Sequence, residues 1–133
     1  MGGGVCDETG GRRPMATILL IDDDPAIRMV FQVVLERAGY HVLTAEHGKH
    51  GLRLLEHQAV DLIIVDIFMP EMDGFELIPL LRASHPASKI IAISGGSGEG
   101  GFLDAARHLG AHDTLKKPFN PQALLETVAA QLP

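Results

Sequence analysis

The sequence predicts an α/β fold, a doubly wound parallel sheet with helices on both faces. Short apolar runs alternate five times with segments of helical periodicity along a chain of 133 residues. The first, third and fourth runs are continuously apolar, as strands are when helices cover both faces of a parallel sheet. The length fits one domain that can bury a core without disulfides. Ligands of such sheets bind beyond the carboxyl ends of the strands, so the residues that follow each strand are the functional candidates.

The first part of this domain carries three βα units. Buried strands are predicted over 17–21, 41–45 and 61–65. After the first strand, apolar residues recur at intervals of three and four from Ile27 to Ala38, which predicts one buried helix face, and Gly39 ends that helix. A weaker helix is expected around 52–55. A third is expected over 74–83, where Pro79 should bend it.

Two further units complete the domain. Strands are predicted over 89–93 and 111–115. The apolar spacing over 102–109 predicts a fourth helix, which Gly110 ends. Asn120 is a good helix cap and Pro121 a good first helical residue, so the last helix begins there and presents its apolar stripe as far as Leu132.

Composition and charge narrow the class of protein. Apolar residues make up 46% of the chain, which is typical of a globular protein, and the net charge of −6 argues against a nucleic-acid-binding domain. Cys6 is the only cysteine, so no internal disulfide can form, and no apolar stretch is long enough to span a membrane. We therefore expect a cytoplasmic protein. Residues 1–14 contain five glycines and no periodicity, which predicts a disordered tail before a domain over 15–133.

Four of the predicted strands end in polar residues. These are Asp22, Asp23 and Asp24 after the first strand, then Asp66, Ser94 and Lys117. Carboxylates that converge where water is partly excluded repel one another, and a hard cation such as Mg²⁺ or Ca²⁺ relieves the repulsion. A hydroxyl and an ammonium suit phosphoryl oxygens, and an aspartate such as Asp66 can act as the nucleophile. The plainer interpretation is helix capping, which we assign to Asp24 alone.

Four stretches together resemble the receiver domain of two-component response regulators. They are LLIDDDPAIR, LIIVDIFMPEMDGFEL, IIAIS and LKKPFNP, in this order and spacing. The resemblance covers about residues 16–132 and implies a chemotaxis-type, flavodoxin-like fold with strand order 2-1-3-4-5. It also implies a phosphoacceptor signalling domain rather than an enzyme, whose own chemistry is limited to accepting a phosphoryl group and later hydrolysing it.

The resemblance implies an acceptor and a metal site. Asp66 corresponds to the phosphoacceptor. Asp23 and Asp66 correspond to direct ligands of Mg²⁺, the backbone carbonyl of Phe68 to a third ligand, and Asp22 to a residue that acts through a metal-bound water.

The residues that bind the phosphoryl group follow the family pattern with one departure. Ser94 corresponds to the hydroxyl that hydrogen-bonds the phosphoryl group in the active state, and Lys117 to the lysine that pairs with it. The Lys117–Pro118 peptide is expected to be cis, which helps to aim the lysine. The family usually has Tyr or Phe three residues before this lysine, where this chain has Thr114, so the usual aromatic readout is missing. The glycine-rich stretch 95–101 predicts a mobile loop that lets Ser94 move, and it matches a dinucleotide fingerprint only weakly.

The implied function is signal transduction. The phosphoryl group is expected to come from a histidine kinase or a histidine phosphotransfer protein, and its arrival to shift a two-state equilibrium. Output is expected to reach a downstream protein target through the face formed by the fourth helix, fifth strand and fifth helix. We expect no output domain in this chain, because only Pro133 follows Leu132, and no nucleic-acid or membrane contact. The oligomeric state expected is a monomer or a weak dimer.

Three other interpretations stay open. The chain can be a receiver excised from a larger regulator. It can be a pseudo-receiver, a scaffold that never accepts phosphate, although the complete residue set argues against this. A phosphatase of the haloacid-dehalogenase type also begins with an Asp-x-Asp motif, but that class needs a second acidic pair after its lysine, and only Glu126 follows Lys117 here. The seven histidines show no metal-ligand spacing, and we interpret them as surface residues.

Overall fold

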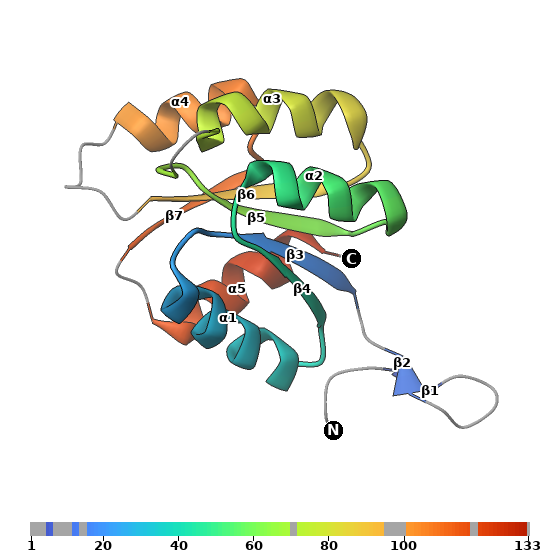
Figure 1. The fold of residues 1–133 in the computed structure, drawn as a ribbon. Coiled ribbons are helices and arrows are strands. Elements are labelled where there is room, and N and C mark those ends of the chain that lie inside the picture. Colours follow the sequence, from blue (N-terminus) through green and yellow to red (C-terminus); the bar gives the residue numbers. More distant parts are fainter. Residues whose placement is uncertain are drawn as a thin grey trace.

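A five-stranded parallel sheet forms the centre of the computed structural model (Figure 1). The structure describes residues 5–6, 12–13, 16–69, 72–94, 101–117 and 120–132. The strands of the sheet are β3 (Thr17–Ile21), β4 (His41–Ala45), β5 (Leu62–Asp66), β6 (Lys89–Ser94) and β7 (Asp113–Lys116). They lie side by side in the order β4-β3-β5-β6-β7, which is the order 2-1-3-4-5 that the resemblance implies.

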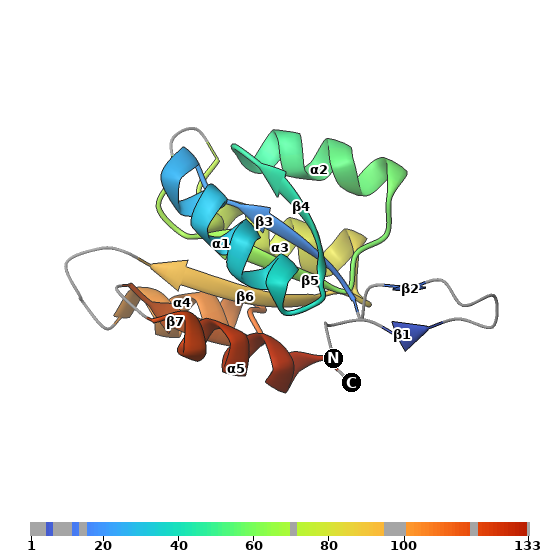
Figure 2. The ribbon, with the colours of Figure 1, turned by 90° about the horizontal axis from the view of Figure 1, so that it is seen from below.

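Five helices cover the sheet on both faces. They are α1 (Pro25–Arg37), α2 (Gly48–His57), α3 (Gly74–Ser84), α4 (Gly101–Leu109) and α5 (Pro121–Gln131). α1 and α5 lie side by side on one face, and α2, α3 and α4 cover the other (Figures 1 and 2). Each face buries its own apolar cluster, because successive residues of each strand point to opposite sides. The predicted doubly wound architecture is therefore confirmed.

The helix ends follow the predicted chemistry. The Asp24 carboxylate accepts hydrogen bonds from the amides of Ala26 and Ile27 and so caps α1. Asn120 caps α5 in the same way. Gly39, just beyond α1, has a φ of 105°, a left-handed conformation in which glycine avoids a steric penalty. α3 contains Pro79 and still runs as one segment from Gly74 to Ser84.

Two strands begin later than predicted, and in both cases a polar side chain explains the shift. β5 begins at Leu62, because Asp61 lies before the strand and its Oδ2 accepts the Thr17 amide at 2.8 Å. β7 begins at Asp113, because the ring of His112 accepts the Ile90 amide at 3.0 Å. Both side chains thus tie neighbouring strands together.

The seven histidines are exposed or half-buried, and two of the half-buried ones bind main-chain amides, which the sequence analysis did not predict. His112 is half-buried, with its Nδ1 on the Ile90 amide and its Nε2 3.4 Å from Arg82. His47 is also half-buried, and it caps α2 by accepting the His50 amide at 3.1 Å. An imidazole nitrogen accepts a hydrogen bond as an aspartate oxygen does, which a search for metal-ligand spacing does not detect.

Two pairs of residues before the sheet are described. Val5–Cys6 and Arg12–Arg13 form the short strands β1 and β2, which pair antiparallel. The rest of residues 1–15 lies outside the described part of the chain, so the disordered tail stays a prediction. Within the described ranges, no helix has the length and apolar character needed to cross a membrane.

Candidate functional site

Four strands deliver polar residues to one edge of the sheet. Asp22 directly follows β3, Asp66 is the last residue of β5, Ser94 is the last residue of β6, and Lys117 directly follows β7. The parallel register places these strand ends together, and the Lys117 amide donates to the Ser94 carbonyl at 2.7 Å. The structure thus brings together residues that are up to 95 positions apart in the sequence.

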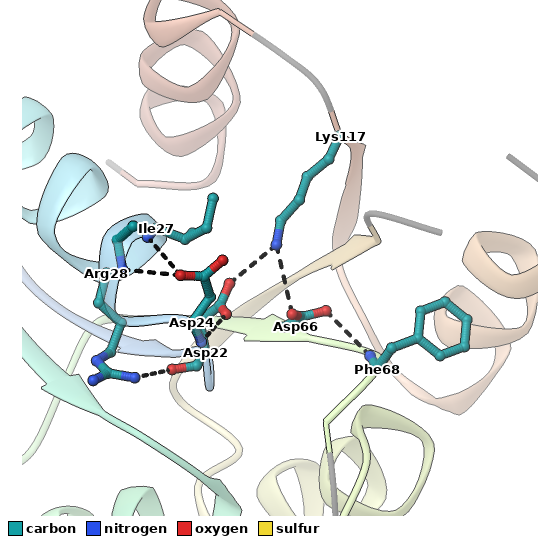
Figure 3. A network of polar contacts seen from close by, with 8 residues as sticks. Asp22, Asp24, Ile27, Arg28, Asp66, Phe68 and Lys117 are labelled. Atoms are coloured by element: carbon teal, nitrogen blue, oxygen red, sulfur yellow. Dashed lines mark hydrogen bonds and ion pairs between the residues drawn. The ribbon is translucent and has the colours of Figure 1, made fainter. Parts of the chain in front are cut away.

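Asp22 is fully buried and held from several directions. Its Oδ1 accepts the Asp24 amide at 2.9 Å, and its Oδ2 accepts from the Lys117 ammonium at 3.1 Å (Figure 3). Its main chain is held as well, because the amide donates to Ala45 and the carbonyl accepts from Arg28 Nη1 at 2.6 Å. A buried carboxylate without such partners would be strongly destabilising.

Asp66 is 6% exposed, and its two carboxylate oxygens have different partners. Oδ1 accepts the Phe68 amide at 3.1 Å, whereas Oδ2 lies 3.5 Å from the Lys117 ammonium (Figure 3). The pKa of Asp66 is raised to about 6, first by burial and then by the charge of Asp22, while Lys117 and the Phe68 amide lower it in part. The site therefore holds a negative charge that is poorly compensated at neutral pH.

Three carboxylates can share a cation here. One ligand oxygen from each of Asp22, Asp23 and Asp66 lies within 4.8 Å of the others. Asp22 and Asp66 are buried while Asp23 is exposed, so the group opens toward solvent on one side. We call these three residues the acidic cluster. An all-oxygen ligand set suits hard cations such as Mg²⁺, which takes one or two carboxylates and completes its shell with water.

The remaining predicted residues lie beside the acidic cluster or outside the described part of the chain. Ser94 is buried at the end of β6, and Phe68 lies two residues beyond Asp66 with its amide on that carboxylate. Pro118 and residues 95–100 are outside the described residues, so the cis peptide and the mobile loop stay predictions. Thr114 lies on β7, where its hydroxyl accepts from Arg107 of α4 at 3.2 Å.

Sequence reasoning missed two residues that shape this site. Arg28, on the first turn of α1, donates a hydrogen bond to the Asp22 carbonyl. The spacing of the sequence motifs does not predict this contact. Gly74, the first residue of α3, packs so closely that a Cβ there would lie 2.7 Å from the Ile67 Cα. The Asp-Gly pair in the stretch MPEMDGFEL was the available signal, because glycine often marks a close approach of backbone segments.

Comparisons with known proteins agree with this architecture. Residues 18–129 match the model of the response regulator receiver domain. Response regulator GtcR of Aneurinibacillus migulanus is 36% identical over 116 residues, which cover 87% of this chain and 47% of GtcR. Transcriptional regulatory protein CpxR of Escherichia coli is 35% identical over 118 residues, which cover 89% of this chain and 50% of CpxR. This chain thus spans about half the length of these two curated relatives.

Solved structures show the same fold. Chemotaxis protein CheY4 of Vibrio cholerae superimposes with a TM-score of 0.82 and 33% identity, and the match covers 89% of this chain and 99% of CheY4. NtrX of Brucella abortus superimposes with a TM-score of 0.84 and 28% identity, over 88% of this chain and 27% of NtrX. Relatives thus include a chain of similar length and others in which this fold is one part of a longer protein.

Proposed function

The chain belongs to the response regulator receiver domain family, and from that premise we propose that it accepts a phosphoryl group on Asp66 and signals by shifting between two conformations. One observation carries this proposal. Asp66 is a buried carboxylate at the carboxyl end of the central strand, with a lysine ammonium on one oxygen and a main-chain amide on the other. These groups orient a nucleophile and offer positive charge where a phosphoryl group would arrive.

The acidic cluster supports a metal-dependent reaction. We propose that Asp23 and Asp66 bind Mg²⁺ directly together with the Phe68 carbonyl, and that Asp22 acts through a water. The raised pKa of Asp66 fits this assignment, because burial and then the charge of Asp22 disfavour its ionised form, which a bound cation would favour. A bound divalent cation neutralises charge on the transferred phosphoryl group.

The proposed transfer uses three side chains of this chain. An Asp66 oxygen forms a bond to phosphorus while the bond between phosphorus and the nitrogen of a donor phosphohistidine breaks. The Lys117 ammonium pairs with one phosphoryl oxygen, and the Ser94 hydroxyl donates to another. Later, water cleaves the acyl phosphate, which restores the Asp66 carboxylate and releases inorganic phosphate.

The partners follow from this chemistry. We propose a histidine kinase or a histidine phosphotransfer protein as the donor, a protein as the downstream target, and the cytoplasm as the compartment. We also propose that residues 15–133 form the receiver domain and residues 1–14 a tail outside it. A second possibility is that the receiver is one part of a longer regulator, and the length of GtcR and CpxR, about twice that of this chain, favours it.

Intact-protein mass spectrometry tests the proposed function. The chain is incubated with a small phosphodonor such as acetyl phosphate, with Mg²⁺ or with a chelator, as wild type, Asp66→Ala and Asp24→Ala. Asp24 is the matched control, since it is an exposed aspartate of the same edge that caps α1. We expect a gain of one phosphoryl mass in wild type and Asp24→Ala, dependent on Mg²⁺, and none in Asp66→Ala.

A second result separates the alternatives. If folded wild type gains no mass, binding of beryllofluoride, which mimics the phosphoryl group, distinguishes a short-lived acyl phosphate from a protein that never accepts phosphate. No beryllofluoride binding in the presence of Mg²⁺ would reject the proposal and favour a pseudo-receiver scaffold. A mass gain that persists in Asp66→Ala would place the acceptor elsewhere.

A further inference from the structure

Three phenylalanine rings meet beside the acidic cluster. Phe68 lies in the loop after β5, Phe75 in the first turn of α3, and Phe102 in the first turn of α4. The Phe68 and Phe102 rings meet edge to face, with centroids 4.9 Å apart, and Phe75 lies 6.4 Å from Phe68 and 6.2 Å from Phe102. These separations are in the range where aromatic pairs attract each other. We call the three residues the aromatic triad.

Phe68 connects the aromatic triad to the acceptor Asp66. The Phe68 amide donates to Asp66 Oδ1, while its ring points away from that carboxylate (Figure 3). The main chain of residue 68 therefore cannot shift without moving both a hydrogen bond to Asp66 and a ring that packs on α4. Any group that changes how the Asp66 carboxylate is held is expected to change the strain on the Phe68–Phe102 contact.

The other end of α4 has an anchor of a different kind. Arg107, in the last turn, donates to Asp113 Oδ1 at 3.1 Å and to the Thr114 hydroxyl at 3.2 Å. This polar anchor joins α4 to β7 at the position where the aromatic side chain is missing. α4 is thus fixed to the neighbouring strand at its end, and to the acceptor loop at its beginning.

The exposure of the rings argues against a purely structural role. Phe68 is 41% exposed and Phe102 is 39% exposed, whereas residues that build the core of the sheet are almost completely buried. Rings that keep so much surface in water add less to folding stability than core residues do. They remain free to repack when the residue between them and Asp66 moves.

We propose that Phe102 is a positioning residue for Asp66, and that the aromatic triad couples the phosphorylation site to the first turn of α4. This inference rests on the proposed function, because the coupling begins at the metal and phosphoryl site. Coupling between two sites is reciprocal in free energy. Binding at Asp66 therefore changes how Phe102 packs, and the packing of Phe102 changes the affinity of the acidic cluster for its cation.

Fluorine NMR reads this coupling directly. The full chain is labelled with 3-fluorophenylalanine at its five phenylalanines, and resonances are assigned with single Phe→Leu variants. Mg²⁺ and then beryllofluoride are added. We expect the Phe68 and Phe102 resonances to shift together while that of Phe31, on the opposite face of the sheet, stays in place. In Phe68→Leu, we expect the Phe102 resonance to lose most of its response.

A calorimetric titration with Mg²⁺ tests the reverse direction. We expect Phe102→Leu to weaken Mg²⁺ binding two- to fivefold, which is roughly the effect of disturbing one aromatic pair. Leu109→Ala is the matched control, because Leu109 lies on the same helix with 36% exposure and outside the aromatic triad. We expect it to bind Mg²⁺ as wild type does. Circular dichroism melts show whether each variant is folded.

The possible outcomes distinguish failure of the proposed coupling from failure of the proposed function. If the Phe68 resonance responds to Mg²⁺ and that of Phe102 does not, the coupling is overturned while the proposed function stands. Equal loss of Mg²⁺ affinity in Phe102→Leu and Leu109→Ala would also overturn it, since any change in α4 would then suffice. If neither resonance responds and no heat of Mg²⁺ binding is detected, the proposed function fails, and the coupling fails with it.

Discussion

The two edges of the sheet use polar side chains in opposite ways. At the edge where strands begin, Asp61 accepts the Thr17 amide, His112 accepts the Ile90 amide, and the Ser88 hydroxyl donates to the Val60 carbonyl at 2.7 Å. Each side chain there satisfies a main-chain group of a neighbouring segment. At the edge where strands end, charged side chains face one another, with Lys117 lying between Asp22 and Asp66.

This difference separates stability from function within one sheet. Hydrogen bonds to main-chain groups tie strands together, and leaving such groups buried without a partner is costly. Carboxylates close to one another do the reverse, since each disfavours the ionised form of the next. The edge where strands end thus sacrifices stability, and we attribute that to the chemistry proposed for it.

Neutralising one carboxylate at the acidic cluster gives the largest expected effect on stability. The pKa of Asp66 is raised to about 6 in the folded chain from its ordinary value of 3.8, so between these pH values the folded state keeps a proton that the unfolded chain has lost. The free energy of unfolding therefore falls as pH rises through this window. The total loss is about 2–3 kcal/mol, because each pKa unit corresponds to about 1.4 kcal/mol. We expect the free energy of unfolding of Asp66→Asn to exceed that of wild type by about 2 kcal/mol at pH 7 without Mg²⁺.

Urea unfolding at several pH values checks this prediction. The gain in Asp66→Asn should disappear near pH 3.8 and shrink when Mg²⁺ is added, because the cation stabilises wild type alone. Asp61→Asn is the matched control at the other edge. It should lose about 1 kcal/mol, as expected when a hydrogen bond from a main-chain amide is weakened. Destabilisation of similar size by both substitutions would break the contrast between the edges.

Removing a hydroxyl at the edge where strands begin gives the next largest effect. Ser88 is buried, and its hydroxyl satisfies the Val60 carbonyl. Ser88→Ala should therefore destabilise the chain by about 1–2 kcal/mol, because a buried acceptor loses its donor. Ser84→Ala removes an equally short hydrogen bond to Leu80, but on the exposed side of α3, and should change stability by less than about 0.5 kcal/mol. Chemical denaturation compares the two, and equal losses would contradict the prediction.

The order of the strands was predicted through the resemblance to the receiver family, whereas the meeting of the charged residues follows from the parallel topology that the sequence pattern predicts. The bounds of β3 and β4 were predicted correctly, and parallel topology alone required Asp22, Asp66 and Lys117 to share an edge. The contacts of His112 and of the aromatic triad do not follow in the same way. They depend on which side chains face each other between elements, and periodicity within one element carries no information about that.

Arg28 tests whether the acidic edge depends on its main chain as well as on its charges. Its guanidinium holds the Asp22 carbonyl at 2.6 Å and so fixes the peptide that leads to Asp23. Arg28→Ala should weaken Mg²⁺ binding about fivefold, which corresponds to about 1 kcal/mol and to the loss of one charge-assisted hydrogen bond in a half-exposed setting. Arg37→Ala, in the exposed last turn of the same helix, is the control. If calorimetry gave equal Mg²⁺ affinities for Arg28→Ala and Arg37→Ala, the contact between Arg28 and the Asp22 carbonyl would not contribute to Mg²⁺ binding.

His112 gives the smallest effect, and its pH dependence has the opposite sign to that of Asp66. Burial lowers the pKa of His112 from 6.5, and the charges of Arg82 and Lys89 lower it further. Below pH 6.5, His112 therefore binds a proton in the unfolded chain but stays neutral in the folded chain until the pH reaches its lower folded pKa. The free energy of unfolding falls as pH falls through this range. The effect is small because the ring is partly open to solvent.

The variant His112→Asn isolates this effect, because its side-chain oxygen can accept the Ile90 amide and does not titrate. Its stability between pH 7.5 and 5, measured by urea unfolding, should fall less than that of wild type. His108→Asn removes an exposed histidine of α4 and should leave the wild-type slope unchanged. If the free energy of unfolding of wild type and of His112→Asn depended on pH in the same way, protonation of His112 would not destabilise the folded state. Of these two residues, Asp66 alone would then make stability depend on pH, and the contrast between the two edges would be lost.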